Sequence, residues 1–285
     1  MDRNQAMPPP AGGAVVLNDG RPMPRIGLGT WRMSSDEAAA AVKAAAGAGY
    51  RLVDTAAAYA NEEGVGRGLR ECGVARAGMF VVTKLWNNRH GKAETRKALG
   101  ESLERLGTDY VDLFLIHWPV PMRGLYAESW KTMVELRNEG LARSIGVSNF
   151  NLGHLDAVIR DSGTVPAVNQ IESHPAFPQA ALGRALESRG ICVQAWSPLG
   201  RKRGLADPAV ARVAARQSLA PAQVLLAWHL AKGRCVIPKS SRPERMAENM
   251  AAADVALSPG DISLLDALDR GDAGRQGGDP EVFAG

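Results

Sequence analysis

The fold follows from three neighbouring stretches, RLVDTAAAYANEEGVG (residues 51–66), MFVVTKLWN (79–87) and YVDLFLIHWP (110–119). Each contains an apolar run of strand length that ends at a polar residue and is followed by a helical pattern. The polar residues are Asp54, Lys84 and His117, and they are separated by roughly 30 residues, the length of one strand–helix repeat. This spacing predicts parallel strands joined by helices.

The same alternation extends outward over most of the chain. Strands are predicted at 26–29, 51–54, 79–84, 110–117, 144–148, 167–172, 192–197 and 235–238. Helices are predicted at 35–46, 61–71, 93–106, 128–139, 152–160, 180–188, 207–217 and 242–250. Eight such repeats favour an α/β fold of the (β/α)8 type, the TIM barrel. An open dinucleotide-binding sheet would require G-x-G-x-x-G after the first strand, whereas GLGTW (27–31) lacks the third glycine.

Segments outside the repeats complete the predicted organisation. A β-hairpin is predicted over 15–24, with its turn at Asn18-Asp19-Gly20, and additional helices are predicted at 221–232 and 258–270. The predicted domain plan is a disordered lead at 1–13, one barrel domain at 14–270, and a Gly-rich tail at 271–285. The tail either folds over the active site, with Phe283 as a contact, or is mobile.

Composition excludes several classes of protein. Of the 285 residues, 45% are apolar, which is enough for a substantial core and excludes disorder for most of the chain. The net charge of +4 is too small to indicate nucleic-acid binding, and no apolar run reaches membrane-spanning length. Cys72, Cys192 and Cys235 form no C-x-x-C pair, and the N-terminus lacks the apolar segment of a signal peptide. We therefore expect a cytoplasmic protein with reduced cysteines and no membrane or nucleic-acid partner.

Asp54, Tyr59, Lys84 and His117 end or follow different predicted strands, so a parallel barrel brings them to one face. Taken singly, each is more often structural; together they form a proton-transfer group. A nearby ammonium lowers a phenol's pKa, which makes Tyr59 the predicted proton donor beside Lys84. Asp54 would keep Lys84 charged, and His117 would donate a hydrogen bond to a substrate oxygen.

Eight motifs in order identify a family resemblance that covers roughly residues 15–270. They are GLGTW, DTAAAYANEEGVGRGL, VVTKLWN, DLFLIHWP, SIGVSNF, VPAVNQIESHPAF, QAWSPLG and VIPKSSRPERMAEN. The chain resembles the aldo-keto reductases, and within them the bacterial 2,5-diketo-D-gluconate reductases. The resemblance implies NADPH-dependent reduction of a carbonyl, either an aldehyde or a keto-sugar acid such as 2,5-diketo-D-gluconate. It implies the same four catalytic residues and a monomer.

A nicotinamide cofactor is implied because side chains alone do not transfer hydride. Residues at the ends of predicted strands offer amide and hydroxyl groups for the carboxamide of the nicotinamide and an aromatic face for its ring. A turn after one of these strands offers backbone amides for the cofactor's pyrophosphate. Basic residues at the start of the helix that follows the last predicted strand suit a 2′-phosphate, so NADPH is predicted to bind better than NADH. The candidate cofactor-binding residues are Thr30, Ser148, Asn149, Gln170, Trp196, Ser197, Leu199, Gly200, Lys239, Ser240, Arg245, Glu248 and Asn249.

Aromatic residues are predicted to line the substrate entrance. Trp31, Trp86 and Trp118 follow different strands and would surround the substrate together with His117. The run Arg201-Lys202-Arg203 either attracts an acidic substrate or is a solvated loop. No metal site is predicted, because Glu172 and His174 lack a third ligand at suitable spacing.

Other functions remain as alternatives. The chain could be a general aldehyde or methylglyoxal reductase, or a non-catalytic protein that senses NADPH. The intact set of four polar residues argues against the sensor. A metal- or phosphate-dependent lyase or isomerase is disfavoured because strand ends carry no clustered carboxylates or histidines.

Overall fold

Eight parallel strands form the centre of the molecule, and the computed structural model describes residues 11–285. The strands are β3 (Leu28–Gly29), β4 (Leu52–Asp54), β5 (Phe80–Leu85), β6 (Val111–Ile116), β7 (Ala142–Ser148), β8 (Val168–Glu172), β9 (Cys192–Trp196) and β10 (Cys235–Val236). Each pairs in parallel with its neighbour in sequence, in the order β3 to β10. Bridges from Ile26 to Val236 and from Gly29 to Lys239 join the first strand to the last and close the barrel.

The closing seam requires a glycine. A Cβ on Gly29 would lie 2.7 Å from the carbonyl oxygen of Ile237, so a side chain there would push the two strands apart. Backbone bonds from Gly27 to Val236 (2.9 Å) and from Gly29 to Pro238 (3.1 Å) cross the same seam. The glycines of GLGTW therefore close a barrel.

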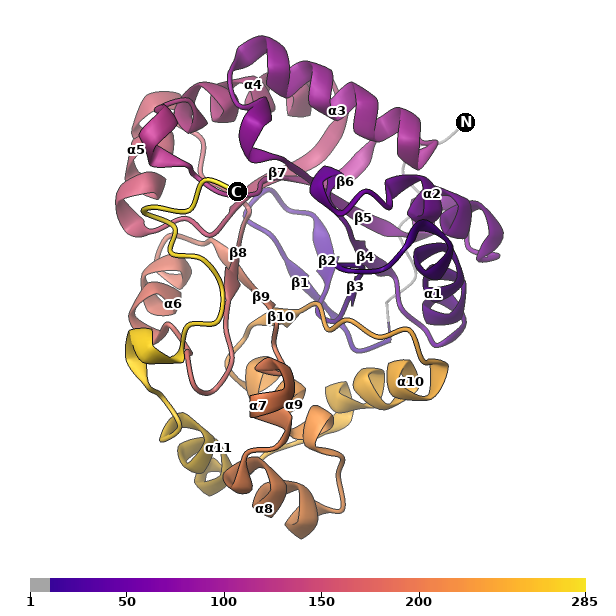
Figure 1. Cartoon of the computed structure of the whole chain (residues 1–285), viewed down its shortest axis with the longest axis vertical. Helices are drawn as coiled ribbons and strands as arrows, with labels where there is room; N and C mark the ends of the chain where they lie inside the picture. Colours follow the sequence, from indigo (N-terminus) through magenta and orange to yellow (C-terminus); the bar gives the residue numbers. More distant parts are fainter. Residues whose placement is uncertain (1–10) are drawn as a thin grey trace.

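Helices surround the strands (Figure 1). They are α1 (Ser35–Gly47), α2 (Glu62–Glu71), α3 (Lys92–Leu106), α4 (Tyr126–Asn138), α5 (Leu152–Ser162), α6 (Ala180–Glu187), α7 (Arg201–Leu205), α8 (Pro208–Gln217), α9 (Pro221–Ala231), α10 (Pro243–Ala251) and α11 (Pro259–Asp266). Local sequence explains individual ends: Ser34 and Glu37 form a capping box that starts α1. None of the helices in residues 11–285 is long and apolar enough to cross a membrane.

Two predicted elements differ from the structure. No helix was predicted at 201–203, whereas this run begins α7, a five-residue helix that carries no apolar period to reveal it. The helix predicted at 258–270 ends at Asp266. Beyond it the chain leaves the helical path, and the backbone N–H of Arg270 donates to the carbonyl of Ala176 at 3.1 Å and not to a carbonyl of the helix. The other predicted helices and strands are present, with ends shifted by a few residues.

The predicted hairpin closes the amino-terminal end of the barrel. Its strands are β1 (Ala14–Val16) and β2 (Pro22–Pro24), which pair antiparallel. Leu17 and Met23 from this hairpin are buried in the same apolar cluster as Leu52 and Phe80 inside the barrel. The barrel floor is therefore filled with apolar side chains, which leaves the opposite end for polar ones. The predicted disordered lead (1–13) lies largely outside the described residues.

A buried histidine makes stability depend on pH. His90 is 3% exposed and neither ring nitrogen has a hydrogen-bond partner among the described residues. Burial, with a smaller contribution from Arg123, lowers the pKa of His90 to about 4. Between pH 6.5 and about 4 the unfolded chain therefore binds a proton that the folded chain excludes, so stability falls as pH falls. Burial also lowers the pKa of His117 and of His229, which adds to the effect.

We expect His90→Leu to flatten this dependence by up to about 1.4 kcal/mol per pH unit. The measurement is the urea midpoint of unfolding for wild type and variant at about pH 7, 6 and 5. The slope of the midpoint against pH is compared between the two proteins, so their absolute stabilities need not be equal. Equal slopes for the two proteins would show that His90 does not titrate differently on folding.

Candidate active site

A cavity of about 490 Å³ opens at the carboxyl ends of the strands. We call it the mouth cavity. The residues singled out from the sequence that line it are Trp31, Asp54, Tyr59, Trp86, His117, Trp118, Ser148, Asn149, Gln170, Trp196, Ser197, Leu199, Arg201, Lys239 and Phe283. Lys84 is fully buried beneath it. The barrel thus brings together side chains from the ends of all eight strands and the segments that follow them, as the strand-end spacing predicts.

The central feature of the mouth cavity is a chain of three polar side chains. Lys84 Nζ donates to Asp54 Oδ1 at 2.6 Å and to the carbonyl of Thr55 at 2.8 Å. Its distance to the Tyr59 hydroxyl is 3.4 Å. Asp54 also accepts a hydrogen bond from Gln170 Nε2 at 2.7 Å, so both carboxylate oxygens are satisfied. This arrangement holds an ammonium against a phenol inside the protein.

The charge state of this chain follows from burial and from the close contacts. Burial alone would lower the pKa of Lys84, but Asp54 and Tyr59 outweigh it and raise that pKa above its ordinary value. Burial raises the pKa of Tyr59, and the Lys84 ammonium opposes this without reversing it. The sequence prediction of a lowered Tyr59 pKa was therefore wrong in direction, because it did not include the depth of the site. The phenol stays protonated and available as a donor at neutral pH.

His117 stands beside the phenol. Its ring centroid lies 5.7 Å from that of Tyr59 and 5.0 Å from that of Trp86, both edge to face. Burial, followed by the charge of Lys84, holds the pKa of His117 well below its usual range, so the imidazole is neutral. A neutral imidazole has one N–H to donate, which suits it to hold a substrate oxygen.

A short turn after β4 positions Tyr59. The chain runs through a single 3₁₀ turn, Ala57–Tyr59, and Ala60 then adopts a left-handed conformation (φ 54°). Asn61 fixes the turn, since its side-chain amide donates to the carbonyls of Thr30 (2.9 Å) and Met33 (3.1 Å). No role was predicted for Asn61 from the sequence, where the available signal is an asparagine placed at the start of a predicted helix.

The predicted carboxamide ligands form one hydrogen-bonded cluster. Asn149 Nδ2 donates to the His117 carbonyl (3.0 Å), and Asn149 Oδ1 accepts from Trp196 Nε1 (2.8 Å). Gln170 Nε2 bridges Asp54 and Gln194, the latter at 2.7 Å. The donors of both amides are thus occupied, while the Oε1 of Gln170 accepts no hydrogen bond from residues 11–285. A ligand bound at this cluster can therefore donate hydrogen bonds to its amide oxygens.

Several predicted cofactor residues lie outside the mouth cavity. Thr30 is fully buried, and its hydroxyl donates to the carbonyl of Asp54 (3.0 Å); it supports the site from beneath. The remaining residues are Gly200 just before α7, Ser240 between β10 and α10, and Arg245, Glu248 and Asn249 within α10. Asn249 and Ser240 are buried, whereas Arg245 is exposed.

Cations gather at the rim of the mouth cavity. Arg32 and Arg201 line it together with Lys239, whereas Lys202 and Arg203 do not. The Arg32 guanidinium lies 4.3 Å from the Trp31 ring and that of Arg201 lies 5.9 Å from it. The predicted basic run therefore contributes one residue, and Arg32 was missed because it stands alone in the sequence.

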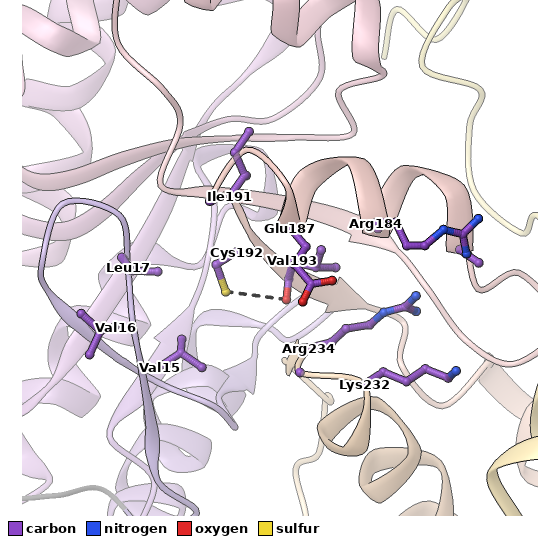
Figure 2. A pocket seen from close by; sticks show the side chains of 14 residues that line it. Val15, Val16, Leu17, Arg184, Glu187, Ile191, Cys192, Val193, Lys232 and Arg234 are labelled. Carbon is purple, nitrogen blue, oxygen red and sulfur yellow. Dashed lines mark hydrogen bonds between the residues drawn. The ribbon is translucent and has the colours of Figure 1, made fainter. Parts of the chain in front are cut away.

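A second cavity of about 450 Å³ lies at the opposite end, between the hairpin, α6 and the segment before β10 (Figure 2). Cys192 lines it, and its sulfur is 3.7 Å from that of the buried Cys235. Neither cysteine is in a disulfide. This cavity contains none of the proton-transfer groups, so the mouth cavity is the candidate active site.

Comparisons with known proteins agree with this geometry. The model of the aldo/keto reductase family matches residues 25–270. The chain belongs to this family of oxidoreductases, and the predicted family, enzyme class and barrel fold are confirmed.

Particular relatives cover nearly the whole chain. An aldo-keto reductase of Mycolicibacterium smegmatis is 47% identical over 94% of this chain and 97% of its own length. Methylglyoxal reductase DkgA of Escherichia coli is 44% identical over 95% of this chain and 98% of its own length. The crystal structure of a mutant of Gox0644 in complex with NADPH is similar at a TM-score of 0.90, with 45% identity over 94% of this chain and 97% of that one.

Proposed function

We propose that the mouth cavity binds NADPH and a small carbonyl compound, and that Tyr59 protonates the carbonyl oxygen as the alcohol forms. The observation that carries this proposal is the contact of the Tyr59 hydroxyl with the buried Lys84 Nζ at 3.4 Å, while Lys84 Nζ itself lies 2.6 Å from Asp54 Oδ1. The Lys84 ammonium supplies positive charge where a phenolate forms, Asp54 holds that ammonium in place, and His117 lies beside Tyr59 to orient the substrate oxygen.

The residues of the mouth cavity fit NADPH. When bound, the cofactor supplies the hydride that side chains lack. The oxygens of Asn149 and Gln170 offer acceptors for a carboxamide N–H, and the half-buried Trp196 offers an aromatic face. Lys239 and Arg201 offer positive charge for phosphates at the rim. A solved relative is described as bound to NADPH, which supports the same cofactor here.

Proton transfer would follow the contacts of the three-residue chain. The Tyr59 hydroxyl gives its proton to the carbonyl oxygen and becomes a phenolate. Lys84, held by Asp54 and the Thr55 carbonyl, stabilises that phenolate by charge and by its hydrogen bond. Trp86 and Trp118 line the cavity beside the reacting groups and limit the access of water.

The proposed substrates are small 2-oxo compounds, with 2,5-diketo-D-gluconate and methylglyoxal as the two to compare. The cations Arg32 and Arg201 at the rim favour an acidic substrate, whereas the relatives named methylglyoxal reductase favour a neutral one. The experiment is NADPH oxidation with these two compounds and with aromatic aldehydes. Preference for an uncharged aldehyde over the keto-sugar acid at low salt would remove 2,5-diketo-D-gluconate from the proposal. The proposal includes a cytoplasmic monomer, which gel filtration and cell fractionation test.

Lys239 provides a prediction about the cofactor. It is exposed at the rim, just after β10, and is proposed to contact the 2′-phosphate that distinguishes NADPH from NADH. Because one charge-assisted contact is lost, Lys239→Gln should weaken NADPH binding about tenfold and leave NADH binding nearly unchanged. Fluorescence titration with both cofactors measures this. Lys202→Gln, an exposed lysine that does not line the mouth cavity, is the matched control. Equal weakening of both cofactors would contradict the assignment.

A further inference from the structure

The carboxylate of Glu172, at the end of β8, is buried with only 3% of the residue exposed. In residues 11–285 its ion-pairing partner is His174, whose Nε2 lies 3.1 Å away, and no lysine or arginine there forms an ion pair with it. Its remaining hydrogen bonds come from the C-terminal tail: Gln276 N donates to Oε1 at 2.7 Å, and Gly277 N donates to Oε2 at 2.8 Å. A buried carboxylate is costly unless it is hydrogen-bonded, so this contact ties the tail to the barrel.

The tail is closely packed at this attachment. A Cβ on Gly277 would lie 2.4 Å from the ring of Trp196 and 3.0 Å from Glu172 Oε2. A cavity of about 10 Å³ lies between Glu172 and the tail residues Arg275, Gly278 and Pro280. Gln276 also donates to the carbonyl of Gly200 at 3.1 Å. The position of residues 276–277 is therefore set by contacts on both sides.

Farther along, the tail is attached a second time and enters the mouth cavity. Asn151 Nδ2 donates to Glu281 at 2.5 Å, and Asn87 Nδ2 donates to the carbonyl of Ala284 at 3.0 Å. Between these attachments Phe283 lines the mouth cavity, with its ring 4.2 Å from that of Trp118. Figure 1 shows this segment in yellow, running from α11 past α6 toward the centre of the barrel.

We propose that Glu172 is a positioning residue that sets the substrate range by holding residues 276–277, and through them Phe283, in place. The proposal rests on the proposed function of the mouth cavity as the carbonyl site. Glu172 acts through the tail and not on the reacting atoms. The substrates affected are those whose apolar groups extend to the Phe283–Trp118 wall, such as 3-phenylpropanal. Methylglyoxal is too small to need that wall.

Glu172→Ala removes both acceptors together with the side chain, and Glu172→Leu removes both acceptors while it keeps much of the side-chain volume. We expect each to raise KM for 3-phenylpropanal by about tenfold, the scale of one lost apolar contact. For this substrate kcat should change little, because Tyr59 and Lys84 are untouched. For methylglyoxal both constants should stay within about twofold of wild type. Glu187→Gln, an exposed glutamate on α6, is the control and should leave all constants unchanged.

Limited trypsin digestion tests the attachment without relying on activity. Cleavage after Arg275 releases residues 276–285, which mass spectrometry detects, and a released tail should be cut at least about tenfold faster. The proposal predicts faster cleavage and the KM change together in both variants. Wild-type cleavage in both, or faster cleavage with wild-type KM for 3-phenylpropanal, would overturn it. Failure of the wild type to reduce any carbonyl would instead refute the proposed function, while cleavage would still report on the attachment.

Discussion

Tyr59→Phe is expected to lower turnover by at least about 10²-fold, the scale of a positioned general acid. The substitution removes one hydroxyl, which faces Lys84 at 3.4 Å. The ring and its edge-to-face contact with His117 remain, so the fold and the affinity for NADPH should be unchanged. Steady-state kinetics with methylglyoxal, together with fluorescence titration of NADPH, measure both quantities.

A second tyrosine provides the control for this prediction. Tyr126 on α4 also contacts aromatic rings, and it lies outside the mouth cavity. Tyr126→Phe should therefore retain wild-type turnover. Turnover near that of wild type in Tyr59→Phe would mean that another group supplies the proton. The roles proposed for Lys84 and Asp54 would then also be wrong, because both depend on a Tyr59 phenolate.

Lys84→Met is expected to lower both turnover and stability. The ammonium that stabilises the phenolate is lost, so turnover should fall by at least about 10²-fold. Stability should fall by about 3–5 kcal/mol, because the substitution leaves the buried Asp54 carboxylate without its counter-charge. The remaining bond from Gln170 places the expected loss toward the lower end of that range.

The double variant Asp54→Asn/Lys84→Met separates the two effects. With both charges removed, no buried ion is left unpaired, and more than half of the lost stability should return. Turnover should remain as low as in Lys84→Met, because the phenolate still lacks a cation. Urea unfolding and kcat are measured on the three proteins. Recovery of turnover in the double variant would show that Lys84 acts only by compensating Asp54.

The positions of the residues at strand ends could be predicted, because the apolar runs mark the strands and the strand–helix repeat shows that the strands are parallel. Asp54, Lys84 and His117 each end or directly follow an apolar run, and parallel strands carry such residues to one face. Tyr59 lies beyond the strand, and its place depends on a turn fixed by Asn61, which spacing alone does not reveal. The direction of its pKa shift depended on burial, which is a property of the assembled barrel.

Other parts of the site depend on contacts between distant segments. Arg32 and Arg201 reach one rim from segments far apart in the chain, and the sequence marked only the second. Thr30, a predicted cofactor residue, does not line the mouth cavity, and its hydroxyl donates to the backbone carbonyl of Asp54, a contact between two strands that spacing does not reveal. Glu172 had no role predicted from the sequence, because its hydrogen bonds come from the backbone amides of Gln276 and Gly277, about 100 residues away in the chain.

The most direct test of the central claim follows a labelled hydride. Wild-type protein is mixed with methylglyoxal and with NADPH that carries deuterium at the transferable C4 position, and the alcohol product is analysed by mass spectrometry. We expect that NADPH is consumed in proportion to product and that deuterium appears on the new carbinol carbon. Tight binding of NADPH without labelled alcohol, with methylglyoxal and with the other carbonyl compounds proposed above, would contradict it and would identify a protein that binds NADPH without catalysis.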